Sequence, residues 1–147
     1  MQINNDIYQT YGHDWWAEDA AFDIYSLRYC MNPVRYGYFK RKLQELRLPG
    51  KTVLDVGCGG GFLAEEFARD GFAVTGIDPA DRSLEAARKH STDNNLEIDY
   101  RAGKGEALPF SDSSFDAHRQ LYSASASYFS MFSSAQVMTM RHSVPCL

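Results

Sequence analysis

The stretch from Thr52 to Arg101 alternates between short apolar runs and helical patterns, and this alternation restricts the fold more than any other feature of the chain. The runs TVLDV, FAVTGID and LEIDYR are typical of strands, and FLAEEFARD and SLEAARKH are typical of helices between them. Strands joined by crossover helices form a parallel sheet with right-handed connections. We therefore expect an α/β chain, and the alternating third run predicts a strand at the sheet edge.

The pattern breaks down where a fourth strand should follow. Phe115 to Ala117 reads FDA, and a doubly wound sheet would place the strand that opens here in its centre, beside the first. A central strand needs apolar residues on both faces, but His118, Arg119 and Gln120 come next, followed by a serine-rich stretch. A fourth strand is therefore doubtful. Our hypothesis is that the chain after about Ala117 is an unrelated or out-of-frame ending on a truncated domain.

The amino-terminal region is predicted to be a helical cover. The first forty residues hold ten aromatic residues without a strand period, and Asn32 and Pro33 look like the N-cap and first residue of a helix. Phe39 and Leu43 recur at helical spacing until Pro49 ends the helix. We divide the chain into a cover at 1–50, an α/β half at 51–116 and an atypical tail at 117–147.

Composition excludes several classes of protein. A net charge of −4, with lysines and arginines scattered apart from Lys40 to Lys42, gives no support for nucleic-acid binding. Three cysteines without a C-x-x-C pair predict neither a disulfide framework nor a zinc site, and a reducing cytoplasmic setting is the default. The sequence has neither a leader pattern nor an apolar run long enough to span a membrane, so only peripheral membrane contact stays open.

The chemistry is concentrated in VLDVGCGGG, from Val53 to Gly61, and in Asp78 at the end of the second strand. Glycines let a ligand approach the backbone, and the helix that follows presents free N–H groups to an anionic group. An acid at the end of the next strand accepts hydrogen bonds from both hydroxyls of a ribose. These features predict a site for an adenosine that carries an anionic group.

Glycine spacing narrows the choice of ligand. A dinucleotide fingerprint starting at Gly57 needs glycine or alanine at position 62, where this chain has Phe62. Asp55 instead completes a D-x-G-x-G pattern, which is typical of class I S-adenosylmethionine-dependent methyltransferases. HDWWAED, NPVRYGYF, the glycine segment and GEALPFSDSSFD together resemble the ubiquinone-biosynthesis O-methyltransferases over about residues 13–116.

The resemblance implies a partial Rossmann-like methyltransferase fold and a set of cofactor-binding residues. It implies that Arg35 pairs with the methionine carboxylate, since a guanidinium fork suits two oxygens. Gly57 and Gly59 would line the methionine and ribose through their backbone. Asp55 would help to hold the ammonium group, and Asp78 would bind the ribose hydroxyls.

Adenine recognition departs from the family pattern. Many relatives carry an aspartate near the adenine amino group, and this chain has Lys104 at that position. The neighbouring residues Gly105, Glu106 and Ala107 are then the candidates for contact with adenine.

No catalytic residue is predicted, because the family's acceptor pocket and catalytic histidine or acid come after the fourth strand. No metal is expected either, since His13, His118 and His142 share no spacing with one another or with an acid. The resemblance implies a small phenolic or quinone-precursor acceptor as the partner, and a homo-oligomer could form through an exposed sheet edge. Two alternatives stay open: a non-catalytic remnant that associates with a partner, and a nicotinamide-binding fragment.

Overall fold

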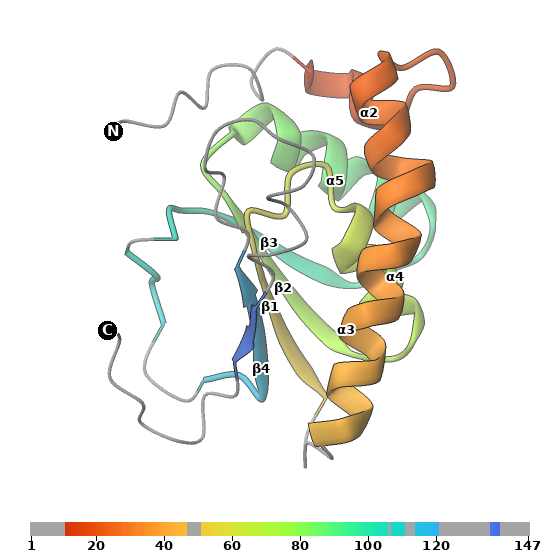
Figure 1. The fold of residues 1–147 in the computed structure, drawn as a ribbon. Coiled ribbons are helices and arrows are strands. Elements are labelled where there is room, and N and C mark those ends of the chain that lie inside the picture. The colour runs from red at the N-terminus through yellow and green to blue at the C-terminus, as the bar shows by residue number, and fades with distance from the viewer. Residues whose placement is uncertain (1–10, 47–50, 106, 111–113, 121–135, 139–147) are drawn as a thin grey trace, which may run out of the picture.

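A single five-stranded sheet organises the described part of the chain (Figure 1). In the computed structural model the described residues are 11–46, 51–105, 107–110, 114–120 and 136–138. The strand order is β3-β2-β1-β4-β5, with the first four strands parallel and β5 antiparallel to β4. The strands are β1 (Thr52–Val56), β2 (Ala73–Asp78), β3 (Ile98–Ala102), β4 (Ala117–Gln120) and β5 (Gln136–Met138).

Helices cover one face of this sheet, and a connecting segment covers part of the other. The crossover helices α4 (Phe62–Arg69) and α5 (Asp81–Asp93) contribute Phe67 and Leu84 to the main core. Phe39 joins that core from α3 (Asn32–Leu46). On the opposite face Leu54, Val56 and Ile77 are buried beneath Leu108, Phe110 and Phe115.

The predicted three strands and two crossover helices are confirmed. The edge position of β3 is confirmed as well, because β2 is its only partner among the described strands. Side chains alternate along β3 as its sequence indicates: Tyr100 is buried, whereas Asp99 and Arg101 are exposed and form an ion pair at 2.6 Å. The period-two pattern therefore reports a strand with one buried face.

The expectation that a fourth strand is doubtful is wrong for residues 117–120. β4 pairs in parallel with β1, from Val53 opposite Ala117 to Val56 opposite Gln120. Backbone N–H and C=O groups form this ladder whatever side chains they carry, and the small side chain of Ala117 is buried at the start of the strand. β1 therefore has a paired strand on both sides, so within the described sheet this strand offers no open edge through which a homo-oligomer could form.

The predicted start of α3 at Asn32 is confirmed, but the predicted N-cap role of Asn32 is wrong. α2 (Phe22–Ser26), a π-helical turn η2 (Leu27–Met31) and α3 follow one another without a break, and Asn32 has helical φ and ψ. Proline inside a helix removes one N–H and crowds the preceding turn. The wide turn directly before Pro33 gives the helix room to continue through it. Instead of capping the helix, the Asn32 side chain donates a hydrogen bond from Nδ2 to the carbonyl oxygen of Phe62 at 3.2 Å.

The three-part division of the chain stays a prediction. β4 and β5 come from the segment assigned to the atypical tail, and the other residues after 120 lie outside the described part. None of the helices in the described residues is long and apolar enough to cross a membrane.

Two glycines predict opposite effects of adding a methyl group. A Cβ on Gly76 in β2 would lie 2.7 Å from the Tyr100 ring and 3.0 Å from the Cys58 sulfur, whereas one on Gly37 in α3 would meet nothing within 4 Å. We expect Gly76→Ala to lower the free energy of unfolding by about 1–3 kcal/mol through overpacking. Gly37→Ala should raise it by about 0.5–1 kcal/mol through helix propensity. Urea denaturation measures both, and equal effects would contradict this account of the core.

Candidate functional site

The loop between β1 and α4 is held against the carboxyl end of β2 by backbone hydrogen bonds. The N–H groups of Gly57 and Cys58 both donate to the carbonyl oxygen of Ile77, at 2.7 and 3.0 Å. Gly57 and Gly61 have φ values of 74° and 86°, in the left-handed region that glycine adopts without strain. The glycine-rich sequence therefore produces a tight loop whose backbone lies at the carboxyl edge of the parallel sheet, where open α/β sheets bind ligands.

Asp78 fixes the same loop through its side chain. One carboxylate oxygen accepts the N–H of Gly59 at 2.9 Å, and the other accepts the N–H of Ala80 at 2.9 Å. Burial raises the pKa of Asp78, and the two backbone N–H groups oppose that shift. A carboxylate oxygen can accept more than one hydrogen bond, so Asp78 retains capacity for a ligand hydroxyl. The sequence pattern identified Asp78 but not its structural role in holding the loop.

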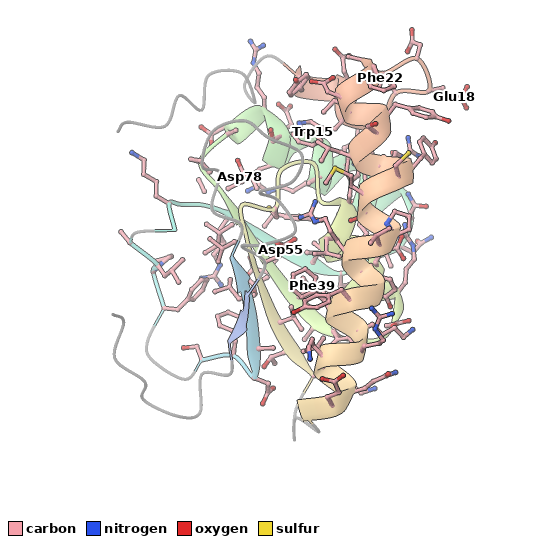
Figure 2. The ribbon with its side chains drawn as sticks, in the orientation of Figure 1. Trp15, Glu18, Phe22, Phe39, Asp55 and Asp78 are labelled. Carbon is pink, nitrogen blue, oxygen red and sulfur yellow. The ribbon has the colours of Figure 1, made fainter. Side chains whose placement is uncertain are left out.

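Asp55 and Arg35 approach each other beside the loop, although they are twenty residues apart in the sequence. Asp55 in β1 is completely buried, and this burial raises its pKa to about 7; the Arg35 charge opposes the shift and the Asp78 charge adds to it. Figure 2 shows Asp55 and Asp78, which lie on the neighbouring strands β1 and β2. Burial lowers the pKa of Arg35 and the Asp55 charge opposes that effect, so the three predicted charged residues are coupled electrostatically.

The Arg35 side chain has hydrogen-bonding capacity to spare. It is half-buried, and its buried Nε makes no hydrogen bond to any residue that the structure describes. A buried donor without an acceptor costs free energy, and an anionic group bound at this place would remove that cost.

The predicted adenine segment begins next to Asp78. The N–H of Gly103 donates to the backbone carbonyl of Asp78 at 3.2 Å, and Ala107 N–H donates to the carbonyl of Lys104 at 3.1 Å. Gly105 lies in the turn between these two residues, and Glu106 lies outside the described residues. The segment thus leaves the carboxyl end of β3 close to the predicted ribose site, while its contact with adenine stays a prediction.

Two tryptophans from the amino-terminal cover contact the loop directly. The Trp15 ring fills the space where a Cβ of Gly59 or Gly60 would lie, at 2.9 and 2.6 Å, and its Nε1 donates to the Ser83 hydroxyl at 3.0 Å. Trp16 donates from Nε1 to the carbonyl oxygen of Gly60 at 2.8 Å. In this structure the protein's own indole makes Gly59 and Gly60 necessary, a contact that the glycine pattern alone does not reveal.

Other groups near the loop do not extend the site. Burial raises the pKa of the Cys58 thiol well above its usual value, which disfavours the thiolate that a nucleophile needs. Within the described ranges no cluster of three or more metal-ligating side chains occurs, so the expected absence of a metal stays a prediction.

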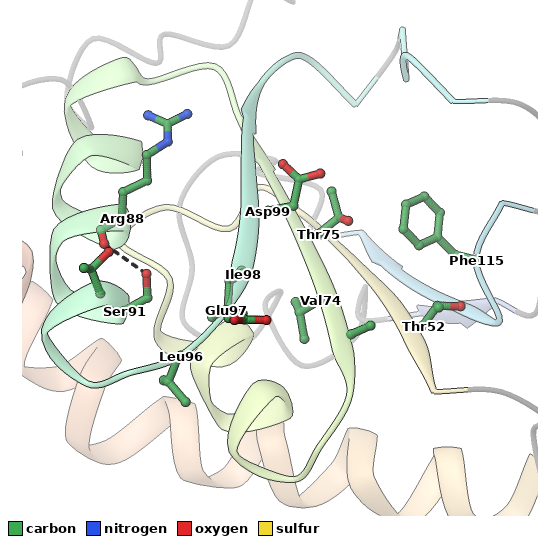
Figure 3. A pocket seen from close by; sticks show the side chains of 12 residues that line it. Thr52, Val74, Thr75, Arg88, Ser91, Leu96, Glu97, Ile98, Asp99 and Phe115 are labelled. Atoms are coloured by element: carbon green, nitrogen blue, oxygen red, sulfur yellow. Dashed lines mark hydrogen bonds between the residues drawn. The ribbon is translucent and has the colours of Figure 1, made fainter.

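A hollow of about 610 Å³ lies elsewhere, at the amino ends of the strands (Figure 3). Thr52, Val74 and Ile98 line it, and none of the predicted cofactor residues does. Because ligands of open α/β sheets bind at the carboxyl ends, we do not assign this hollow to the cofactor.

Comparison with known proteins supports the predicted resemblance. The chain is 45% identical over 100 residues to the ubiquinone biosynthesis O-methyltransferase of Actinobacillus pleuropneumoniae serotype 5b, covering 68% of this chain and 41% of the relative. It is 40% identical over 120 residues to that of Methylocella silvestris, covering 72% and 46%. The chain thus spans less than half the length of these curated relatives, and the resemblance predicted from the sequence is confirmed.

Solved structures show the fold of the chain, and a family description shows its family. Magnesium protoporphyrin IX methyltransferase from Synechocystis PCC 6803, solved with bound SAH, has a TM-score of 0.61 at 20% identity, covering 77% of this chain and 54% of that one. A methyltransferase structure from Methanococcus maripaludis, described as putative and S-adenosyl-L-methionine-dependent, has the same TM-score and identity, covering 80% and 52%. At this identity they show the fold alone, which confirms the predicted Rossmann-like class. The family described as "Methyltransferase domain" matches residues 53–140, more than half of the sequence, and the chain therefore belongs to this methyltransferase family.

Proposed function

We propose that this chain binds S-adenosylmethionine at the glycine loop and forms the cofactor-binding part of an O-methyltransferase. The observation that carries the proposal is the convergence of Arg35, Asp55 and Asp78 on one loop at the carboxyl ends of β1 and β2. A guanidinium and two carboxylates in this arrangement match a ligand that carries a carboxylate, an ammonium group and a ribose.

Each charged residue has a distinct role in this proposal. Arg35 binds the methionine carboxylate, which would supply the acceptor that its buried Nε lacks among the described residues. Asp55 holds the ammonium group. Asp78 accepts hydrogen bonds from the ribose hydroxyls while it also keeps its hydrogen bond from the N–H of Gly59. The backbone of Gly57 and Gly59 lines the ligand.

Adenine recognition completes the proposed site. Gly105, Glu106 and Ala107 follow β3 and would contact the base, because the backbone of Gly103 directly before them is tied to Asp78.

The reaction needs little covalent chemistry from the protein. The cofactor, when bound, supplies a methyl group on a sulfonium, and in-line transfer to an acceptor oxygen leaves S-adenosylhomocysteine. The described residues align the cofactor and withdraw it from water, and such positioning is a large part of catalysis by displacement. The phenol proton must pass to a base, and we assign no described residue to that role.

The proposed acceptor is a small phenol or quinone precursor. This proposal is supported by the relatives named ubiquinone biosynthesis O-methyltransferase, which are 40–45% identical to the chain over the regions they share. A cytoplasmic location, with peripheral membrane contact left open, belongs to the same proposal.

A second candidate is association with a partner through the long amino-terminal helix. Phe22, Tyr25 and Tyr29 on α2 and η2 are exposed, Phe22 to 80%. Exposed aromatic residues on one helix are typical of interaction surfaces.

A nicotinamide cofactor is disfavoured by Phe62. Its buried ring contacts Trp16 at a centroid distance of 4.7 Å and occupies the position at which the dinucleotide fingerprint needs glycine or alanine.

Calorimetric titration with S-adenosylhomocysteine and with NADH tests the proposed ligand. We expect the wild-type chain to bind the former and not the latter. Asp78→Asn should weaken binding on the order of 10–100-fold, because charge-assisted hydrogen bonds to the ribose are lost. Asp93→Asn removes an exposed carboxylate paired with Lys89 on α5 and serves as the matched control, with unchanged affinity. Binding of NADH alone would overturn the proposal, and binding of neither ligand would favour the partner-association candidate.

The pH dependence of binding tests the role of Asp55. Because its pKa is raised to about 7, the carboxyl is mostly neutral at pH 5.5 and becomes charged as the pH rises. Only the charged form attracts an ammonium group, so S-adenosylhomocysteine should bind on the order of 3–10-fold more tightly at pH 7.5 than at pH 5.5. Asp55→Asn should bind more weakly with a flatter profile. If the affinity of Asp55→Asn rises with pH as steeply as that of the wild type, the group responsible for the pH dependence is not Asp55.

A further inference from the structure

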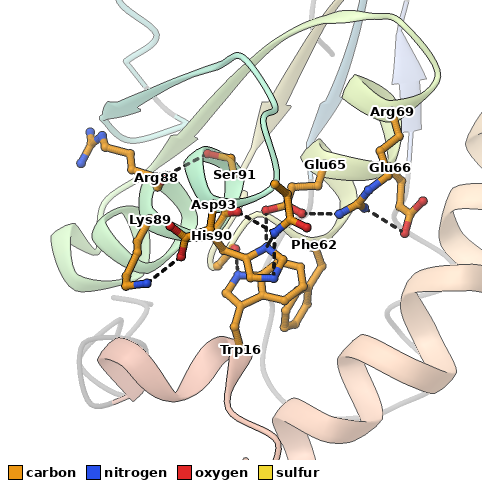
Figure 4. Close-up of polar contacts among 12 residues, drawn as sticks. Trp16, Phe62, Glu65, Glu66, Arg69, Arg88, Lys89, His90, Ser91 and Asp93 are labelled. Atoms are coloured by element: carbon orange, nitrogen blue, oxygen red, sulfur yellow. Dashed lines mark hydrogen bonds and ion pairs between the residues drawn. The ribbon is translucent and has the colours of Figure 1, made fainter.

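Three side chains from three different elements form a continuous series of contacts that ends on the glycine loop (Figure 4). Glu65 of α4 contacts His90 of α5, with 2.7 Å between Oε1 and Nδ1. The His90 ring stacks on Trp16 of η1 (Gly12–Trp16), with centroids 3.4 Å apart and an interplanar angle of 4°. Trp16 then donates its indole N–H to Gly60.

The buried end of this series is fixed firmly. Glu65 is completely buried, and its second carboxylate oxygen pairs with Arg69 at 2.7 Å. A buried carboxylate is costly unless its oxygens are partnered, so the two contacts hold the Glu65 side chain in one position. His90 is therefore oriented by a residue on the helix that begins directly after the loop.

The other end fixes the orientation of a peptide group in the loop. The Gly60 carbonyl oxygen accepts from Trp16, and the N–H of Gly61, on the same peptide plane, donates to the Cys58 carbonyl at 2.9 Å. Rotation of this peptide would break both hydrogen bonds. Because Gly60 and Gly61 carry no side chains that would oppose such a rotation, the two hydrogen bonds supply a directional restraint on this peptide.

Trp15 differs from its neighbour in this respect. Its indole N–H donates to the Ser83 hydroxyl in α5, and the residue as a whole is 4% exposed. Trp15 therefore contributes packing over Gly59 and Gly60, whereas Trp16 contributes a directional contact to the loop backbone.

We propose that Trp16, oriented by His90 and Glu65, is a positioning residue that holds the Gly60–Gly61 peptide in the orientation required for cofactor binding. The inference rests on the proposed function, because it assigns the loop to S-adenosylmethionine. Preorganised loops bind more tightly since less conformational freedom is lost on binding. The aromatic amino-terminal cover is thereby coupled to the cofactor site through a backbone carbonyl.

The variant that tests this inference is Trp16→Phe, which keeps an aromatic ring against His90 and removes the N–H donor. We expect the affinity for S-adenosylhomocysteine to fall about 3–10-fold, the effect of one lost hydrogen bond. His90→Phe should weaken binding in the same direction. The double variant should bind no more weakly than Trp16→Phe alone, because both residues act through one contact. Lys89→Ala, beside His90 on the exposed face of α5, is the matched control.

Hydrogen exchange of the ligand-free chain separates this inference from the proposed function. Trp16→Phe should speed amide exchange at Gly61 while leaving the exchange of the β2 amides unchanged. If the wild type fails to bind the ligand but the variant still speeds exchange at Gly61, the proposed function fails and the positioning role stands. If the wild type binds and neither affinity nor exchange responds to Trp16→Phe or His90→Phe, the positioning role is overturned.

Discussion

The hydrogen bonds between the end of β2 and the glycine loop are the constraint on which the rest of the site depends. The Ile77 carbonyl accepts two loop N–H groups, and the Asp78 carboxylate accepts a third. These contacts fix where the loop leaves β1 and therefore where α4 begins. They also place Asp78 near the buried Asp55, whose charge interacts with that of Arg35, so one backbone arrangement serves both the fold and the proposed cofactor site.

The amino-terminal cover also contacts the glycine loop, through two tryptophans. Trp15 packs over Gly59 and Gly60, and Trp16 donates a hydrogen bond to the carbonyl oxygen of the Gly60–Gly61 peptide. The long helix that follows carries Arg35 toward Asp55 and is tied to the start of α4 by Asn32. Residues that precede the first strand in the sequence thus complete a site whose central loop joins β1 to α4.

The sequence predicts the periodic parts of this architecture well. The β1–α4–β2–α5–β3 order follows from local hydrophobic patterns, and Asp78 follows from its place at the end of a strand. The β4 ladder escapes prediction because backbone groups form it and the side chains at 118–120 carry no strand pattern. The Trp16–Gly60 contact escapes prediction for another reason: it joins residues 44 positions apart, and only the docked cover brings them together. The roles of Arg35 and Asp55 come from family resemblance, and the structure adds that these two charges interact.

The edge strand β3 has a consequence for how the molecule behaves in solution. Its exposed face carries the Asp99–Arg101 ion pair, and the strand is only five residues long. Short edge strands with charged side chains are poor templates for pairing with a strand of another molecule. The alternation of buried and charged side chains along β3, which is typical of an edge strand, therefore also disfavours aggregation through this edge of the sheet.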